Sequence, residues 1–225
     1  MDWEALWLTL QLDFVVCLLL LFVGVPVALW LSFTRWRWKF LVEAVVALPL
    51  VLPPTVLGFY LLIALGPRSP FGRAYGWIWG HGLAFTFSGL VVASVIYSLP
   101  FMVQPLASAF SAVDPKVIAA SEVLGASRVR TFFRVIMPLS MSGLLTGLVL
   151  TFAHTLGEFG VVLMVGGNIP GITRTVSVSI YDNVQALDYI AAGQTSLFLL
   201  IASFVILAAV YASNRRGSVA WPLGR

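Results

Sequence analysis

The chain has few charged residues for its length. Of 225 residues, 13 are Lys or Arg and 9 are Asp or Glu, so only 10% are charged, whereas 60% are hydrophobic. The mean hydropathy is +0.99. Because soluble globular domains carry about 25% charged residues, this composition excludes that class and predicts a protein that lies in a lipid bilayer.

Several chemical signatures are also missing. Cys17 is the single cysteine, so no disulfide can form within the chain. With only two histidines, His81 and His154, the sequence offers no cluster that predicts a metal site. No Gly-x-x-x-x-Gly-Lys-Ser/Thr motif occurs, so nothing in the chain can cradle the phosphates of ATP. We therefore expect neither a cofactor nor an enzyme active site in this chain.

Five apolar stretches are long enough to cross a bilayer. A transmembrane helix needs about 20 apolar residues to span ~30 Å of hydrocarbon, and the stretches that reach this length are 6–33, 40–65, 83–110, 139–165 and 191–211. No soluble domain of any size remains between them. The sequence predicts an all-α, polytopic membrane protein with about five transmembrane helices, forming a single domain over residues 1–225.

The basic residues are distributed unevenly between the two sides of the predicted membrane. One side has Arg68, Arg73 and Arg174; the other has Arg35, Arg37, Lys39, Lys116, Arg128, Arg130, Arg134, Arg215, Arg216 and Arg225. Because cytoplasmic loops are enriched in Lys and Arg, we expect the N-terminus outside and the C-terminus in the cytoplasm. Anionic lipid headgroups then account for the net charge of +4, and we expect no nucleic acid partner.

The second apolar stretch contains three prolines, Pro49, Pro53 and Pro54. Each proline removes a backbone donor and bends or opens a helix, which is tolerated only where protein or a water-filled cavity satisfies the freed carbonyl groups. Ordinary bending explains any one of them. The three together favour an element that lines a pathway or moves, with Pro53 and Pro54 as candidate pore or gate residues.

The fourth apolar stretch has one polar face. Residues at the spacing of one helix side are Gly147, Thr151, His154 or Thr155, and Glu158. The spacing of Gly143 and Gly147 is typical of close helix approach, and we expect this glycine face at a symmetric interface between two subunits.

An ionisable side chain inside a membrane is costly and indicates function by default. His154 and Glu158 are four residues apart and could form a hydrogen-bonded pair. Three roles compete for them: a structural pair at a subunit interface, a gate that faces a pore, and a proton relay. The structural or gating role ranks first, with Thr151 and Thr155 on the same face.

A polar interruption at residues 111–138 separates the third and fourth stretches. Asp114 has the character of a helix N-cap and Pro115 of a first-turn residue, so we expect a short helix from Lys116 to Leu124. Gly125 can adopt the left-handed conformation that ends it. A second helix then begins near Ser127, so the segment forms an elbow rather than a flexible loop.

This elbow resembles the cytoplasmic signature of importer-type (type I) ABC transporter permeases. That signature is Glu-Ala-Ala, three residues, Gly, nine residues and Ile-x-Leu-Pro; here the corresponding residues are Ala119-Ala120-Ser121, Gly125 and Val135-Ile136-Met137-Pro138. Ala119 replaces the usual Glu, and Glu122 lies nearby. The resemblance implies that the elbow contacts a cytoplasmic ATPase through Lys116, Ala119, Ala120, Ser121, Glu122, Gly125 and Arg128.

A second resemblance lies further along the chain. Gly157-Glu158-Phe159-Gly160, followed by Asn168-Ile169-Pro170-Gly171-Ile172-Thr173-Arg174-Thr175, is similar to molybdate ABC permeases and more loosely to sulfate permeases. The resemblance implies import of a tetrahedral oxyanion through the bacterial inner membrane. It further implies a permease homodimer, two ATPase subunits that bind ATP and Mg, and a periplasmic oxyanion-binding protein. The cargo stays open among molybdate, tungstate and sulfate.

The segment 166–190 is predicted to be a periplasmic loop with an amphipathic helix. Between Thr175 and Leu187, one face is formed by Val176, Ile180, Val184 and Leu187. Asn168 and Arg174 lie at the expected outer mouth. There Arg174 could attract an anion, help to dock a delivery protein, or extend to the membrane interface.

Two other classes of protein fit the sequence less well. A proton-coupled secondary transporter could use His154 and Glu158, but it leaves the elbow unexplained and the chain lacks inverted repeats. A membrane-embedded enzyme is weaker still, because the spans contain no paired carboxylates and no nucleophile with a base.

Overall fold

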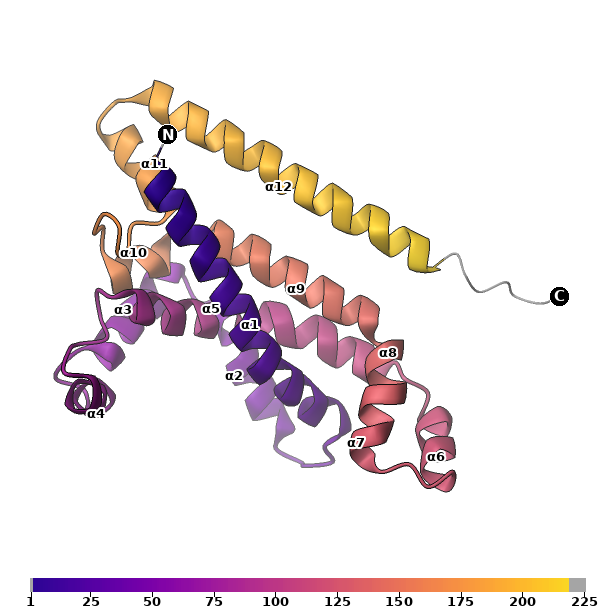
Figure 1. Ribbon diagram of the computed structural model, residues 1–225. Coiled ribbons are helices and arrows are strands. Elements are labelled where there is room, and N and C mark those ends of the chain that lie inside the picture. Colours follow the sequence, from indigo (N-terminus) through magenta and orange to yellow (C-terminus); the bar gives the residue numbers. More distant parts are fainter. Residues whose placement is uncertain (1, 219–225) are drawn as a thin grey trace.

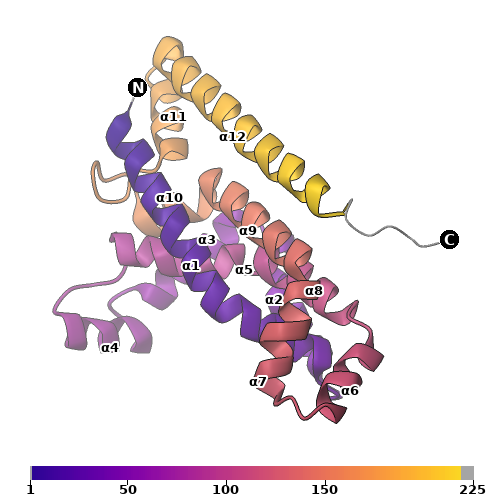
Figure 2. The ribbon, with the colours of Figure 1, turned by 45° about the vertical axis from the view of Figure 1, so that its right-hand side comes forward.

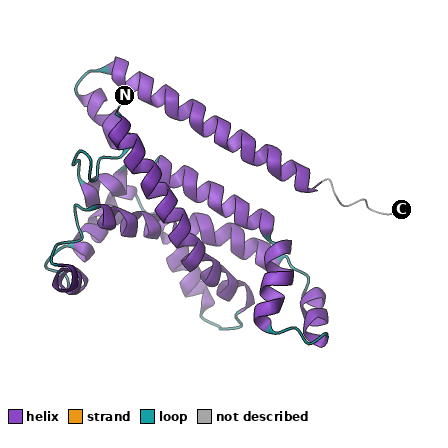
Figure 3. Cartoon of the chain, in the orientation of Figure 1, coloured by secondary structure: helices purple, strands orange, loops and turns teal. Residues whose placement is uncertain are grey.

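The computed structural model describes residues 2–218, and over that range it consists of helices and loops (Figures 1 and 3). Residues 1 and 219–225, which include the predicted cytoplasmic Arg225, lie outside the described residues. The predicted all-α class is confirmed.

Three helices are long and apolar enough to cross a membrane: α1 (Trp3–Phe33), α5 (Phe87–Ser111) and α12 (Tyr189–Ser218), the last over its part Tyr189–Ala208. Two bent pairs also qualify. In one, α2 (Lys39–Val51) meets α3 (Pro54–Leu65) at 114°; in the other, the segment Arg128–Leu139 meets α9 (Met141–Leu156) at 72°. Counting each pair as one span gives five, in agreement with the prediction of about five.

The second predicted span is broken at Leu52 and Pro53. Leu52 ends α2 with an extended ψ of 136°, Pro53 precedes α3, and Pro54 is its first residue. A proline forces the preceding residue away from helical angles, so the consecutive prolines explain the break. Pro49 lies inside α2. The expected opening of the helix therefore occurs at Pro53 and Pro54.

The fourth predicted span, 139–165, is also not continuous. Helix α9 ends at Leu156, residues 157–159 form a break, and the short α10 (Gly160–Gly166) follows. Glycines at 157 and 160 weaken the helix at this point. A Cβ at Gly160 would lie 2.7 Å from the Cβ of Pro54, so the glycine lets α10 pack closely on α3.

The core forms where α1 and α9 pack against α5. Its fully buried side chains include Leu12, Leu20, Met102, Leu106 and Phe110. Figures 1 and 2 show α1 crossing α5 obliquely while α9 runs beside α5.

The glycine face of α9 packs inside the subunit. A Cβ at Gly143 would overlap the side chain of Ala109 and lie 2.9 Å from the carbonyl oxygen of Pro105, and one at Gly147 would lie 3.1 Å from the carbonyl oxygen of Met102. Because α5 of the same chain occupies this face, the prediction of a symmetric interface there was wrong.

The two ends of the molecule are distinct (Figure 1). The N-terminus, α10 and α11 (Val176–Gln185) lie at one end, whereas α6 (Pro115–Val123) and α7 (Arg128–Thr131) lie at the other. Between α3 and α5, the short α4 (Pro70–Trp79) exposes Trp77 and Trp79. Helix α12 stands apart from the bundle in Figures 1 and 2, contacts α11 and α9, and leaves apolar side chains such as Leu200 and Phe204 exposed.

Candidate functional site

The elbow (residues 111–138) consists of two short helices joined at a glycine. Asp114 caps α6 by accepting a hydrogen bond from the Lys116 amide at 2.8 Å, and Ser127 caps α7 through the Arg130 amide at 3.3 Å. Gly125 lies between them with φ of +79°, a left-handed conformation that glycine adopts without penalty. The predicted helices and the predicted glycine stop are confirmed.

A side-chain contact holds the two helices together. The hydroxyl of Ser121 lies 2.9 Å from that of Thr131, and the amide of Ala126 donates to the carbonyl of Ser121 at 3.0 Å. In the sequence, Ser121 stood out only as a departure from the resembled signature. The spacing of ten residues between Ser121 and Thr131 did not predict their contact, because the contact depends on how the elbow folds.

The outer surface of the elbow is apolar and exposed. No residue of α6 is buried, Ala119 and Ala120 are exposed, and Val123 and Leu124 are 89% and 87% exposed. Soluble surfaces rarely expose contiguous apolar side chains without a partner. Val123 and Leu124 are therefore available for contact with a partner, and Lys116 is exposed beside them.

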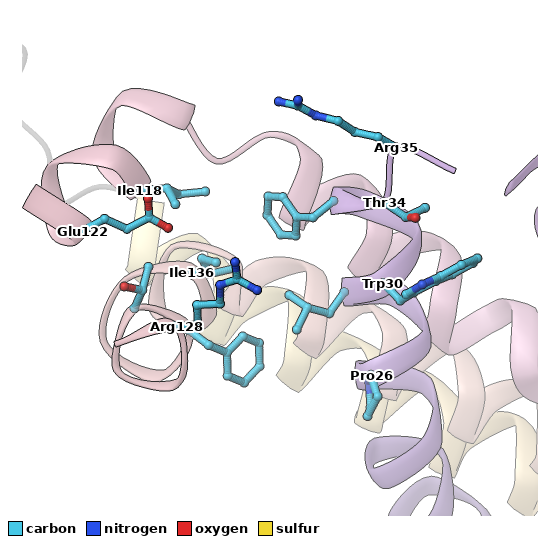
Figure 4. Close-up of a pocket in the computed structure, with 12 residues that line it drawn as sticks. Pro26, Trp30, Thr34, Arg35, Ile118, Glu122, Arg128 and Ile136 are labelled. Atoms are coloured by element: carbon cyan, nitrogen blue, oxygen red, sulfur yellow. The ribbon is translucent and has the colours of Figure 1, made fainter. Parts of the chain in front are cut away.

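The inner side of the elbow faces α1 across a cavity of about 760 Å³ (Figure 4). Figure 4 shows Glu122 and Arg128 on the elbow side and Trp30 and Arg35 on the α1 side. After α7 the chain forms a π-helix, η1 (Phe132–Ile136), and then α8 (Met137–Leu139). Such π segments often occur at functional sites, and the sequence did not predict this one.

The polar face of α9 is directed at α5. Thr151 and Thr155 are buried, and the Thr155 hydroxyl lies 2.9 Å from that of Ser98. At the break of the second span, Pro54 meets α10 at Gly160, whereas Pro53 lies just before α3. The candidate gate residues therefore form two contacts, one between α9 and α5 and the other between α3 and α10.

The predicted pair of His154 and Glu158 does not form. The Nδ1 atom of His154 lies 2.9 Å from the Ser98 hydroxyl, and its ring stacks on Phe101 with centroids 4.0 Å apart. Because α9 ends at Leu156, Glu158 leaves the helical register on which the pairing depended. The expected hydrogen bond was wrong for that reason.

Glu158 instead lies buried in the break between α9 and α10. It is 4% exposed, and neither of its carboxyl oxygens has a hydrogen-bond partner among the described residues. Asp13 of α1 is in the same condition, with 0% exposure and two unpartnered oxygens. Asp13 was not among the predicted site residues, although a carboxylate in an apolar span is the same signal that indicated Glu158.

The outer-mouth residues Asn168 and Arg174 belong to one polar network. Arg174 donates to the Asn168 side-chain oxygen at 2.7 Å and forms ion pairs with Asp182 at 3.3 Å and Asp2 at 3.8 Å. Asn168 also donates to Asp182. The charge of Arg174 is thus balanced by two carboxylates, an arrangement that none of its three predicted roles included.

Helix α11 was predicted as amphipathic, but its buried face differs from the expected one. Val176 and Val178 are buried, whereas Val184 and Leu187 are 42% and 71% exposed. The start of α11 is fixed to α1, because the Val176 amide donates to the Thr9 hydroxyl at 2.9 Å. The predicted face was therefore wrong over the second half of the helix.

Three known proteins are similar to this chain in sequence. A molybdenum transport system permease protein ModB from Azotobacter vinelandii is 52% identical over 214 residues, covering 95% of this chain and 95% of that protein. The protein of the same name from Escherichia coli (strain K12) is 40% identical over 185 residues, covering 82% and 80%. A protein from Bacillus subtilis (strain 168) named "Putative molybdenum transport system permease protein YvgM" is 36% identical over 200 residues, covering 89% of this chain and 88% of that protein.

The fold matches a solved importer. A bacterial alginate ABC transporter, in complex with an alginate pentasaccharide-bound periplasmic protein, contains a chain with a TM-score of 0.78 at 18% identity, covering 95% of this chain and 78% of that one. The family model for the binding-protein-dependent transport system inner membrane component matches residues 21–217. The chain belongs to this family of importer membrane subunits and folds as an ABC importer permease.

Proposed function

We propose that the chain is the membrane-spanning subunit of an ATP-driven importer that moves molybdate into the cytoplasm. The observation that carries this proposal is the 52% identity to a molybdenum transport permease over 95% of both proteins. Tungstate and sulfate are the alternative cargoes, because all three are tetrahedral dianions.

The assembly that we propose has two copies of this chain, two cytoplasmic ATPase subunits and a periplasmic oxyanion-binding protein. A neighbour in fold was solved with a periplasmic protein that carries its ligand, which supports the last of these partners. ATP and Mg are held by the ATPase subunits. The cytoplasm lies on the side of the elbow and the C-terminus, and the N-terminus lies outside, as the basic residues favour.

In this proposal the exposed face of α6 docks in a groove of the ATPase. Val117 and Val123 supply apolar contact, while Lys116 and Glu122 supply charge at its rim. The Ser121 to Thr131 contact makes the elbow stiff, so a movement of α6 is transmitted to α7 and on to α9. Alternating access then follows from closure and reopening of the ATPase dimer.

The test is reconstitution of the chain with its ATPase subunit in liposomes, with a molybdate-loaded binding protein on the outer side. We expect the loaded binding protein to stimulate ATP hydrolysis, and we expect ATP-dependent uptake of labelled molybdate that excess sulfate does not compete away. Competition by sulfate would overturn only the assignment of molybdate as the cargo. Uptake that follows an imposed proton gradient without the ATPase would overturn the class of transporter.

A further inference from the structure

The cavity between α1 and the elbow has an apolar wall on the α1 side. The lining residues there are Pro26, Leu29, Trp30 and Phe33, whose spacing places them on one face of the helix. From Pro26 to Phe33 this wall extends about 10 Å along the helix axis, at about 1.5 Å per residue. Trp30 and Phe33 are 42% and 44% exposed, so the described residues leave much of the wall uncovered.

The opposite wall of the cavity is apolar as well. It is formed by Ile118 of α6 and by Phe132 and Ile136, the two ends of the π-helix η1. The volume of about 760 Å³ falls within the range of roughly 300–1,000 Å³ that is usual for sites that bind small molecules. The cavity is therefore large enough to hold part of a ligand with an apolar body.

Two arginines line the same cavity, Arg35 just after α1 and Arg128 at the start of α7. In Figure 4, Arg128 lies between the elbow and α1, and Arg35 extends from the chain that follows α1. Both side chains are exposed, and the ion pairs within residues 2–218 involve neither of them. Glu122 is the single carboxylate of the lining. Positive charge is thus in excess, and the cavity favours an anionic group at the arginines.

The position of the cavity along α1 places it at the edge of the membrane. Helix α1 is a candidate span that ends at Phe33, and the rings of Trp30 and Trp36 pack with centroids 6.0 Å apart. Tryptophan is enriched where a bilayer meets water. In the orientation proposed above, this is the cytoplasmic leaflet, which contains anionic lipids.

We propose that this cavity binds one anionic phospholipid, with its phosphate group at Arg35 and Arg128 and the upper part of an acyl chain against the wall from Pro26 to Phe33. A free phosphate or molybdate ion would leave both apolar walls in water, whereas an acyl chain covers them. The bound lipid contacts α1 and the elbow at once, so it links a membrane span to the proposed coupling element. Only the side of the membrane rests on the proposed function, and lipid binding is measured without transport.

The test is native mass spectrometry of the full chain in detergent, with equal amounts of phosphatidylglycerol and phosphatidylcholine. We expect one phosphatidylglycerol to be retained on each chain in preference to phosphatidylcholine. Each basic residue near the membrane surface contributes roughly a fivefold preference for anionic lipid. The double variant Arg35→Gln/Arg128→Gln should therefore bind phosphatidylglycerol about 25-fold more weakly, with an unchanged affinity for phosphatidylcholine. Because both arginines are exposed, the melting temperature should stay the same.

Two further variants separate the site from its surroundings. Arg37→Gln/Arg130→Gln removes the same charge from two exposed arginines that do not line the cavity, and it should keep the bound phosphatidylglycerol. Phe33→Gln makes one apolar wall polar, and it should release the lipid although both arginines are present. A site for a bare anion would not respond to Phe33→Gln.

Three results would overturn the lipid site. The first is an equal loss of phosphatidylglycerol in the two double variants, which would reduce the effect to diffuse surface charge. The second is displacement of the lipid by inorganic phosphate or molybdate together with full retention in Phe33→Gln, which would indicate a site for a small anion. The third is a dimer of the chain that carries no lipid while the monomer does, which would show that a second copy fills the cavity.

Discussion

The hydroxyl groups of Ser121 and Thr131 lie 2.9 Å apart and join α6 to α7 across the elbow. Ser121 also donates to the carbonyl of Ile118 at 2.8 Å, so its hydroxyl is held within α6 while it meets Thr131. This contact joins the exposed helix to the helix that leads to the membrane.

The Ser121 to Thr131 contact should be worth about 1 kcal/mol, the usual net value of such a hydrogen bond. We expect Ser121→Ala and Thr131→Val each to weaken the stimulation of ATP hydrolysis by the loaded binding protein, and the double variant to add little to either. A double-mutant cycle on thermal stability measures the coupling directly. Effects that add fully in the cycle would show that the two hydroxyls act independently.

Gly125 should tolerate no side chain without a loss of coupling. Its φ is +79°, and a left-handed residue with a Cβ costs about 1–2 kcal/mol. A Cβ there would meet no atom within 4 Å, so Gly125→Ala is destabilised only by the strain of its backbone. Gly125→Pro cannot adopt the left-handed conformation at all, because proline fixes φ near −65°.

Transport assays should therefore rank wild type above Gly125→Ala and Gly125→Ala above Gly125→Pro, with all three present in the membrane. The matched control is Gly82→Ala, at an exposed glycine without a left-handed φ and without atoms nearby; it should transport normally. Full uptake by Gly125→Pro would contradict the elbow as a coupling element.

Gly143 should be intolerant of substitution for a different reason. A Cβ at this position would overlap the side chain of Ala109 in α5, and overpacking of a tight contact costs about 1–3 kcal/mol. We expect Gly143→Ala to lower the melting temperature in detergent. Gly193→Ala in α12, where a Cβ meets nothing within 4 Å, should not lower it; equal effects of the two would disprove the tight packing of α9 on α5.

Features set by a few neighbouring residues could be predicted from the sequence. The elbow helices were located correctly, because Asp114, Pro115 and Gly125 determine the conformation of the backbone next to them. The break in the second span was likewise marked by Pro53 and Pro54. The count of spans followed from the lengths of apolar stretches, which the bilayer fixes.

Features that depend on which helices meet could not be predicted in the same way. The face of Gly143 fits a helix of the same subunit as well as one of a partner, and only the packing on α5 distinguishes them. The pairing of His154 with Glu158 assumed a continuous helix, which ends at Leu156.

Arg174 should stabilise the outer end of the protein without attracting the anion. Its side chain is 29% exposed and is balanced by Asp182 and Asp2, so little positive field remains for an approaching dianion. We expect Arg174→Gln to lower thermal stability by about 1 kcal/mol, the upper range for partly exposed ion pairs, and the loss should shrink at high salt because ions screen the wild-type pairs. The KM for the loaded binding protein in ATPase assays should stay unchanged.

Arg73→Gln, at an exposed arginine expected on the same side, is the control and should leave stability unaffected. A large rise in KM for Arg174→Gln, with stability equal to that of the control, would instead assign Arg174 to anion capture or to docking of the binding protein, because a residue that only ties the N-terminus to α11 cannot change the affinity for a partner while leaving the fold as stable as before.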